Sequence, residues 1–275
     1  MSALLRVDTQ KCQRDGACLA ECPAGIIRFG KADGFPEPVP GAEAFCIHCG
    51  HCVAVCPHGA LSHIRITPAD CAPIEESLIP TPPQVEQFLR ARRSVRAFAR
   101  QPLDREQIVR LIDTARFAPS GHNLQPVHWR VVYDRAAVAA MAGHVVDWMR
   151  HLIAANNPLA ALLHMDRAVA AHERGREPIL RGAPHLVVAH APKVDRTAPP
   201  ACTIALAYLE LAASTHGLGA CWAGYFNTAA GLWPPLQAAL ALPAEHASFG
   251  ALMLGRPRFV YHRIPPRNPA RVTWT

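Results

Sequence analysis

Seven cysteines and one aspartate near the N-terminus form two copies of one pattern, offset by 34 residues. The first copy reads C-x2-D-x2-C-x3-C-P over residues 12–23, and the second reads C-x2-C-x2-C-x3-C-P over residues 46–57. Asp15 therefore stands where the second copy has Cys49. Short strand-like segments flank each copy, so we expect a small duplicated fold with one ligand-bearing loop in each half.

The second copy has the cysteine spacing that holds iron–sulfur clusters in bacterial ferredoxins. In proteins with two such clusters, the fourth cysteine of each run ligates the cluster of the other run. This rule predicts that cluster one is held by Cys12, Asp15, Cys18 and Cys56. It predicts that cluster two is held by Cys46, Cys49, Cys52 and Cys22. Disulfides and structural zinc are the alternatives, and the duplication and the x3-C-P ending argue against zinc.

Asp15 leaves two interpretations of cluster one open. Iron in a cluster prefers thiolate ligands but tolerates oxygen, so the carboxylate can complete a 4Fe–4S cluster. Alternatively, Asp15 is a solvated loop acid and the site holds a 3Fe–4S cluster. The C-x2-D-x2-C spacing resembles that of some archaeal-type ferredoxins, in which the aspartate is a ligand, and this resemblance favours the first interpretation.

Charge divides the chain into two parts. Residues 1–75 hold 6 basic and 8 acidic side chains, a net charge of −2, whereas residues 76–275 hold 22 and 13, a net charge of +9. Basic groups near a flavin phosphate or facing an acidic electron donor explain the second value without nucleic acid. No run of about 20 apolar residues predicts a membrane span. Metal-binding thiolates, without an export signal in the first ten residues, predict a cytoplasmic protein.

The predicted organisation has three parts. Residues 1–66 form a two-cluster, ferredoxin-like domain that is too small for a large hydrophobic core, so the clusters act as staples. Residues 67–83 form a proline-rich linker that should run extended, and it contains Cys71, outside both ligand patterns. Residues 84–275 mix helices with strands and predict a single α+β domain.

Periodicity and capping residues predict the elements of this larger domain. Helices are expected at 84–94, from Asp104 onward, at 134–149, at 159–175 and at 200–216. Strands are expected at 129–133, 186–191, 221–224 and 249–255. The C-terminal segment from residue 261 is too rich in proline to be helical.

Three stretches of the larger domain carry groups suited to a cofactor. Residues 92–96, RRSVR, bring three guanidinium groups and a hydroxyl together, and these groups can bind a phosphate. Residues 118–126, APSGHNLQP, form a turn-rich loop whose polar groups can hydrogen-bond planar amide edges. Residues 217–224, GLGACWAG, let the backbone approach a ring closely.

In this order, the motifs RRSVRxF, APSxxNxQP and GLGxCWxG, followed by LGRP and PPRNP, resemble the nitroreductase family. The resemblance extends from about residue 85 to the C-terminus, and the whole chain resembles the ferredoxin-fused branch of that family. The resemblance implies an FMN-binding domain of α+β fold. It also implies a homodimer with FMN at the subunit interface.

The same resemblance implies FMN contacts residue by residue. The phosphate and the N1/O2 edge would be bound by Arg92, Arg93, Ser94, Arg96 and Arg267, with Arg256 and Arg263 as further candidates. The flavin of the other subunit would be reached by Pro119, Ser120, Gly121 and Asn123. The isoalloxazine would lie along Cys221, Trp222, Ala223 and Gly224, with an N–H of Ala223 or Gly224 facing N5.

Two side chains are considered for a direct role in the reaction. His122 is a candidate proton donor to substrate, and a loop histidine bonded to backbone is the alternative. Cys221 is expected to be a packed thiol beside the ring rather than a nucleophile, because nothing near it in the sequence is typical of an activating base.

These features together predict an FMN-dependent oxidoreductase that receives electrons through two iron–sulfur clusters and reduces a small organic acceptor. The acceptor classes left open are nitroaromatics, quinones, activated alkenes and halogenated aromatics. No GxGxxG follows a predicted strand, so the expected donor is a low-potential protein such as ferredoxin or flavodoxin. Two alternatives remain: an electron carrier or redox sensor without small-molecule turnover, and dehalogenating or flavin-modifying chemistry on the same fold.

Overall fold

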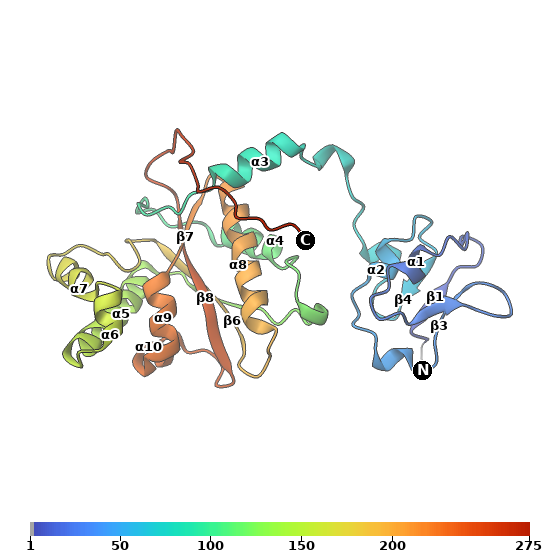
Figure 1. Ribbon diagram of the computed structural model, residues 1–275, viewed down its shortest axis with the longest axis horizontal. Coiled ribbons are helices and arrows are strands. Elements are labelled where there is room, and N and C mark those ends of the chain that lie inside the picture. The colour runs from blue at the N-terminus through green and yellow to red at the C-terminus, as the bar shows by residue number, and fades with distance from the viewer. Residues whose placement is uncertain (1–2) are drawn as a thin grey trace. The chain divides into compact units, whose positions relative to one another are not determined.

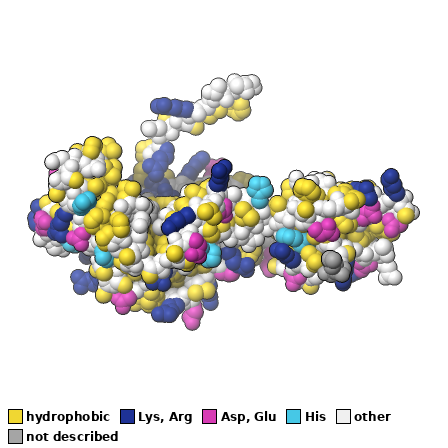
Figure 2. Space-filling model, turned by 90° about the horizontal axis from the view of Figure 1, so that it is seen from below, with side chains coloured by type: hydrophobic (Ala, Val, Ile, Leu, Met, Phe, Trp, Pro, Cys, Tyr) yellow, Lys and Arg dark blue, Asp and Glu magenta, His cyan; other side chains and the backbone are white. Residues whose placement is uncertain are grey.

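The computed structural model describes residues 3–275, which divide into two units. The first unit comprises residues up to Pro80 together with 122–124, and the second comprises 81–121 and 125–275. Among the described residues, no helix combines the length and the apolar composition needed to cross a membrane. Figure 2 shows acidic and basic side chains interspersed on the face of each unit that it draws.

The first unit is built from two similar halves. The first half contains β1 (Leu5–Val7), α1 (Ala17–Ala20) and β2 (Ile27–Phe29). The second half contains β3 (Pro36–Pro38), the turn η1 (Ala42–Ala44), α2 (His51–Ala54) and β4 (Leu61–His63). Antiparallel pairing joins β1 to β4 and β2 to β3, so each small sheet takes one strand from each half.

The two ligand loops share one backbone conformation. Left-handed φ angles recur at pairs of positions separated by 34 residues: Arg14 (59°) and His48 (51°), Gly16 (79°) and Gly50 (75°), and Gly25 (61°) and Gly59 (56°). Glycine occupies two of these pairs because it alone adopts such angles without steric cost. The sequence repeat is therefore also a repeat of structure.

The core of the first unit is small. Its buried cluster consists of Leu4, Leu5, Cys18, Ile26, Ile27, Ala42 and Leu61. Three further cysteines pack against this cluster: Cys22, Cys46 and Cys52. So few apolar side chains bury little surface, which is why a fold of this size ordinarily depends on metal or disulfides.

The segment predicted to be an extended linker contains two short turns, η2 (Pro68–Asp70) and η3 (Glu76–Leu78). Helix α3 (Pro82–Ala91) then begins two residues before the predicted boundary at 84. The backbone N–H of Thr81 donates to Oε1 of Gln84 at 2.8 Å, which caps the helix, and proline is tolerated in a first turn.

A four-stranded antiparallel sheet forms the centre of the second unit. Its order is β5 (His128–Val132), β6 (His185–Pro192), β8 (His246–Gly255) and β7 (Gly219–Trp222). Successive residues of β6 are buried on opposite faces: Leu186 and Val188 face one hydrophobic cluster, and Val187 and Ala189 face the other. The predicted α+β class is confirmed, because helices are combined with a sheet whose strand pairs are all antiparallel.

Two layers of helices cover the sheet (Figure 1). Helices α4 (Arg105–Ala115) and α8 (Ala198–Thr215) cover one face. The other face is covered by α5 (Arg135–Ala154), α9 (Gly224–Leu232) and α10 (Pro234–Leu240). The short helices α6 (Pro158–Leu162) and α7 (Met165–Glu173) pack against α5, and the turn η4 (Gly121–Asn123) precedes β5.

Further sequence predictions for the second unit differ from the structure. The single helix expected at 159–175 is two helices, because His164 adopts a left-handed conformation (φ 49°) between them. The strand expected at 221–224 lies at Gly219–Trp222, because Ala223 already caps α9. Helices α9 and α10 were not predicted. Helix α10 begins with two prolines, which argue against a helix in the sequence. In the first turn, however, proline is tolerated, because the amide that it lacks has no partner there.

Candidate functional site

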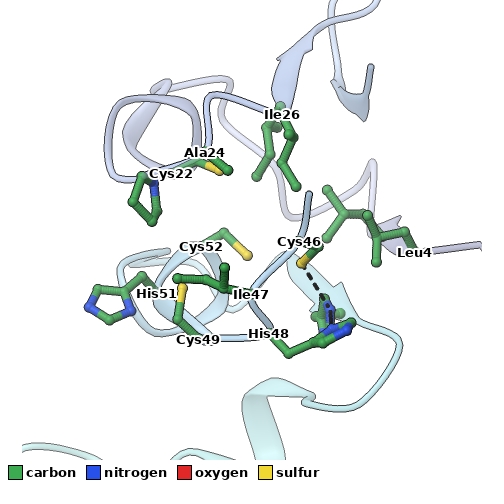
Figure 3. A pocket seen from close by; sticks show the side chains of 15 residues that line it. Leu4, Cys22, Ala24, Ile26, Cys46, Ile47, His48, Cys49, His51 and Cys52 are labelled. Carbon is green, nitrogen blue, oxygen red and sulfur yellow. Dashed lines mark hydrogen bonds between the residues drawn. The ribbon is translucent and has the colours of Figure 1, made fainter. Parts of the chain in front are cut away.

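Two cavities in the first unit are lined by the two predicted ligand sets. One is lined by Cys22, Cys46, Cys49 and Cys52 together with neighbouring backbone and apolar groups. In Figure 3, Cys22 lies on one side of the space and the other three cysteines lie opposite. The second cavity is lined by Cys12, Asp15, Cys18 and Cys56 together with neighbouring groups. Each cavity thus combines three ligands of one half with the fourth cysteine of the other.

The thiols of each cavity interact electrostatically, mainly within their own set. Burial, together with charge on Cys49, Cys22 and Cys46 and on Cys18 of the other set, raises the pKa of the Cys52 thiol to about 11. Burial also raises the pKa of Cys18, with Cys56, Asp15 and Cys12 adding to the shift. Crowded, buried thiols of this kind require a cationic centre to ionise together, as iron provides. Both donor sets therefore fit an iron–sulfur cluster.

Asp15 points into the first-cluster cavity but already has protein partners. Its Oδ1 accepts a hydrogen bond from the backbone N–H of Ala17 at 2.9 Å, at the start of α1. Its Oδ2 lies 3.8 Å from Nε2 of His58. The side chain is 38% exposed. A carboxylate has further lone pairs, so this arrangement is compatible with both interpretations of Asp15.

In the second unit, three of the predicted phosphate-binding arginines line one open cavity. This cavity, of about 890 Å³, is lined by Arg92, Arg93 and Arg267 together with Leu89, Arg90, Ile264, Pro265 and Pro266. Nη2 of Arg93 donates to the backbone oxygen of Arg90 at 2.6 Å, while its Nε is buried without a hydrogen-bond partner. A buried cationic donor beside such a cavity fits an anionic ligand.

Glu210 is a site residue that the sequence interpretation missed. Its carboxylate, 7% exposed, accepts from Nη1 of Arg92 at 2.9 Å and from Nε1 of Trp222 at 3.2 Å. It therefore links two residues of separate predicted cofactor motifs. The sequence could have indicated it, because Glu210 is the one acidic residue of the apolar helix α8 and a buried carboxylate is stable only when it is paired.

The RRSVR segment lies directly against strand β7. The backbone N–H of Val95 donates to the oxygen of Ala220 at 2.9 Å. The Cys221 thiol is buried, which raises its pKa, while the neighbouring Arg96 and Arg181 and a hydrogen bond to Ser94 act in the opposite direction. The two motifs therefore meet in the fold, and the protonated thiol favours a packing role for Cys221.

The two backbone amides predicted to face N5 differ in their hydrogen bonds at the end of β7. The N–H of Ala223 donates to the oxygen of Ala251 at 3.0 Å, so it is used within the sheet and does not suit the predicted contact with N5. Gly224 is the first residue of α9, where a helix leaves its amide without an internal partner. Of the two predicted amides, Gly224 is therefore the available donor.

The loop at 118–126 is placed apart from the arginine cavity. Pro119 and Ser120 line a separate cavity of about 510 Å³, where the Ser120 hydroxyl accepts from the N–H of Gln125 at 3.0 Å. His122, Asn123 and Gln125 all have left-handed φ angles, which is uncommon for residues other than glycine. Gly121 allows close packing, since a Cβ there would lie 2.9 Å from Thr197. Within one chain, Pro119 and Ser120 do not join the RRSVR group.

Comparison with known proteins gives this architecture its family. Residues 89–256 match the model of the nitroreductase family, which is more than half of the chain. The chain belongs to the nitroreductase family. Residues 7–60 match the model of a 4Fe–4S dicluster domain, so the combination of the two domains is confirmed. The N-terminal unit of this nitroreductase-family protein is accordingly a domain for two 4Fe–4S clusters.

Among curated proteins, the chain is 33% identical over 186 residues to a 5,6-dimethylbenzimidazole synthase of Rhodospirillum rubrum. The match covers 63% of this chain and 82% of that protein. Among solved structures, a nitroreductase with bound FMN from Bacteroides fragilis NCTC 9343 has a TM-score of 0.56 at 21% identity, covering 69% of this chain and 98% of that chain. A BluB-like flavoprotein from Clostridium difficile 630 has a TM-score of 0.55 at 21% identity, covering 67% and 94%. Both structures share the fold.

Proposed function

We propose that this chain is an FMN-dependent oxidoreductase in which two 4Fe–4S clusters deliver electrons to a flavin site that reduces a small organic acceptor. The observation that carries the proposal is the pair of cavities in the N-terminal unit, each lined by one interleaved ligand set, on a chain of the nitroreductase family. When bound, FMN supplies the exchange between one-electron and two-electron chemistry.

In this proposal, the cluster ligands are the eight residues of the two cavities. Cluster two is held by four thiolates, and cluster one by three thiolates and the carboxylate of Asp15. Cysteine supplies the soft donors that iron–sulfur clusters prefer, and the interleaved fourth ligand ties the two halves of the unit together.

The FMN phosphate is assigned to the cavity of Arg92, Arg93 and Arg267, where guanidinium groups bind and orient it. Glu210 holds Arg92 in place through a buried ion pair. Ser94 is proposed to bind near the phosphate, Arg96 near the N1/O2 edge, and Cys221 and Trp222 along the ring. The Gly224 amide is the donor proposed for N5. Pro119, Ser120, Gly121 and Asn123 are proposed to act on the FMN of a second subunit in a homodimer, with His122 as a proton donor.

A second candidate function rests on the curated relative. Its name, 5,6-dimethylbenzimidazole synthase, belongs to a protein 33% identical to this chain over 186 residues, which favours flavin-modifying chemistry over dehalogenation among the alternatives. The two functions differ in the fate of the flavin. Under the first proposal FMN is retained through many turnovers. Under the second, FMN would be lost during turnover, and a benzimidazole would appear in the product mixture.

The test of the main proposal is anaerobic stopped-flow reduction of bound FMN by reduced ferredoxin and by NADPH. Cys49→Ser removes one ligand of cluster two and should slow ferredoxin-dependent FMN reduction at least tenfold, while FMN content stays unchanged because the arginine cavity lies in the other unit. Cys71→Ser is the matched control, since Cys71 lines neither cluster cavity.

Equal rates in the wild-type protein and Cys49→Ser would remove cluster two from the electron path. Faster reduction by NADPH than by ferredoxin would assign the chain to pyridine-nucleotide-dependent reductases. Steady-state turnover with nitroaromatics and quinones separates the enzyme from an electron carrier, because a carrier shows fast FMN reduction without product.

A further inference from the structure

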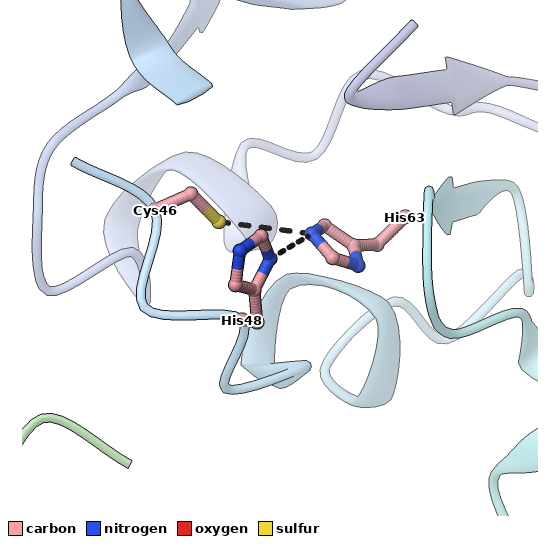
Figure 4. A group of neighbouring side chains, drawn as sticks. All are labelled: Cys46, His48 and His63. Carbon is pink, nitrogen blue, oxygen red and sulfur yellow. Dashed lines mark hydrogen bonds between the residues drawn. The ribbon is translucent and has the colours of Figure 1, made fainter. Parts of the chain in front are cut away.

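His63, at the end of β4, lies beside one of the proposed cluster-two ligands. Its Nε2 is 3.7 Å from Sγ of Cys46 and 3.1 Å from Nδ1 of His48. Figure 4 shows both contacts meeting at the same ring nitrogen of His63. The imidazole is 4% exposed, so water does not compete freely for these contacts.

The hydrogen bonds of His63 determine which ring nitrogen carries its proton. The backbone N–H of Arg65 donates to Nδ1 of His63 at 3.1 Å. A backbone amide can only donate, so Nδ1 must be the acceptor and the ring proton must be on Nε2. The Nε2–H group therefore points to Cys46 and His48, and Nδ1 of His48 accepts. A thiolate at Cys46 and the imidazole of His48 share one donor.

The first half of the unit has no equivalent donor at this position. The residue 34 positions before His63 is Phe29, and the residue 34 positions before His48 is Arg14. The backbone conformations of the two ligand loops match, so this difference lies in the side chains. A ring N–H directed at the first cysteine of the ligand loop is therefore a property of the second half alone.

We propose that His63 is a positioning residue that donates a hydrogen bond to the Cys46 thiolate and thereby raises the reduction potential of cluster two relative to cluster one. A donor at a ligand sulfur stabilises the more negative, reduced cluster more than the oxidised one. The partial sharing with His48 limits this effect. The inference rests on the cluster-two ligand set of the proposed function, but it needs neither the proposed donor nor the proposed acceptor.

The test is an EPR-monitored redox titration of the anaerobically purified protein, with iron and sulfide contents measured on the same samples. His63→Phe introduces the residue found at the equivalent position of the first half. It should lower the reduced-to-oxidised ratio of cluster two about tenfold at a given applied potential, which equals a fall of about 59 mV in the reduction potential of cluster two. The potential of cluster one should not change, so it serves as an internal control. His63→Gln, which keeps an N–H donor, should recover part of the shift.

His48→Gly should shift cluster two in the opposite direction, because it removes the acceptor Nδ1 and frees the His63 proton for Cys46. Glycine is also tolerated at the left-handed φ of this position. A wild-type cluster-two potential in fully loaded His63→Phe protein overturns the proposal. If His63→Phe loses cluster-two iron, His48→Gly decides, and a cluster-two potential in that variant equal to or below that of the wild type overturns the proposal. A redox titration requires no turnover, so its result can be interpreted even if the protein shows no activity in the assay of the proposed function.

Discussion

Asp15 and Cys49 occupy equivalent positions in the two ligand loops and have different chemistry. The carboxylate of Asp15 faces three thiols but also accepts the N–H of Ala17 at 2.9 Å. That bond resembles the one made by Asp33, which accepts the N–H of Phe35 at 3.0 Å in an exposed turn. A local bond to the chain is thus common to both aspartates, and only Asp15 lines a cluster cavity.

Substitution of Asp15 should change cluster one alone. Asp15→Cys is expected to keep a 4Fe–4S cluster and to lower its potential, because thiolate is the more electron-donating ligand. Asp15→Ala should favour 3Fe–4S, which lowers the iron content from about eight to about seven per chain. EPR spectra and iron analysis check both outcomes, with Asp33→Ala as the matched control. Unchanged spectra in both Asp15 variants would remove Asp15 from the ligand set.

At the scale of elements, the packing of the RRSVR segment on β7 depends on one glycine. A Cβ at Gly219 would lie 2.5 Å from Cγ2 of Val95, closer than side-chain atoms approach. The same contact region holds the hydrogen bond from Val95 to Ala220. The absence of a side chain at Gly219 therefore sets how closely two predicted cofactor motifs approach each other.

Gly219→Ala should push the RRSVR segment away from β7. We expect a loss of about 1–3 kcal/mol in unfolding free energy, as for overpacked cores, and a lower FMN content. The double variant Gly219→Ala/Val95→Ala should recover part of both, because it removes the contacts with Cγ2 and Cγ1 of Val95 at 2.5 and 2.9 Å and leaves the contact with its Cβ at 2.8 Å. Gly231→Ala is the control, since a Cβ there meets no atom within 4 Å in α9. Denaturant unfolding and flavin absorbance test this, and a stable, fully FMN-loaded Gly219→Ala would contradict it.

At the scale of the whole molecule, the two units differ in what stabilises them. The first unit buries one cluster of seven residues, and its cysteines line two cavities. The second unit buries apolar side chains on both faces of its sheet. A small core depends on metal, whereas a large core does not.

Removal of iron should therefore unfold one unit and leave the other folded. Calorimetry of the loaded protein should give two transitions, and anaerobic chelation should abolish the one belonging to residues 3–66. The transition of the second unit should keep its midpoint within a few degrees. Cys71→Ser should behave as the wild type. A single transition that disappears entirely on chelation would show that the second unit also depends on the clusters.

The sequence by itself determined the features that are encoded by neighbouring residues. The 34-residue repeat predicted a duplicated cluster domain, and the family motifs predicted the α+β flavin-type domain, because ligand spacing, turn glycines and periodicity act over short distances along the chain. The helix beginning after Asp104 could likewise be predicted from its capping residues. Helix α10 could not, since proline breaks a helix in its interior but is tolerated in its first turn. Helix α9 could not, since Ala223 at its start has no side chain that can cap it.

Only the tertiary structure decided which distant groups meet. Glu210 pairs with Arg92, 118 residues away in the sequence. The ring of His63, at the end of β4, lies beside the thiol of Cys46. The backbone N–H of Ala223 donates to the oxygen of Ala251 in β8. None of these contacts follows from spacing, because each depends on the packing of a helix or strand against another. Long-range packing sets the partner of a buried polar group, and desolvation makes that partner obligatory.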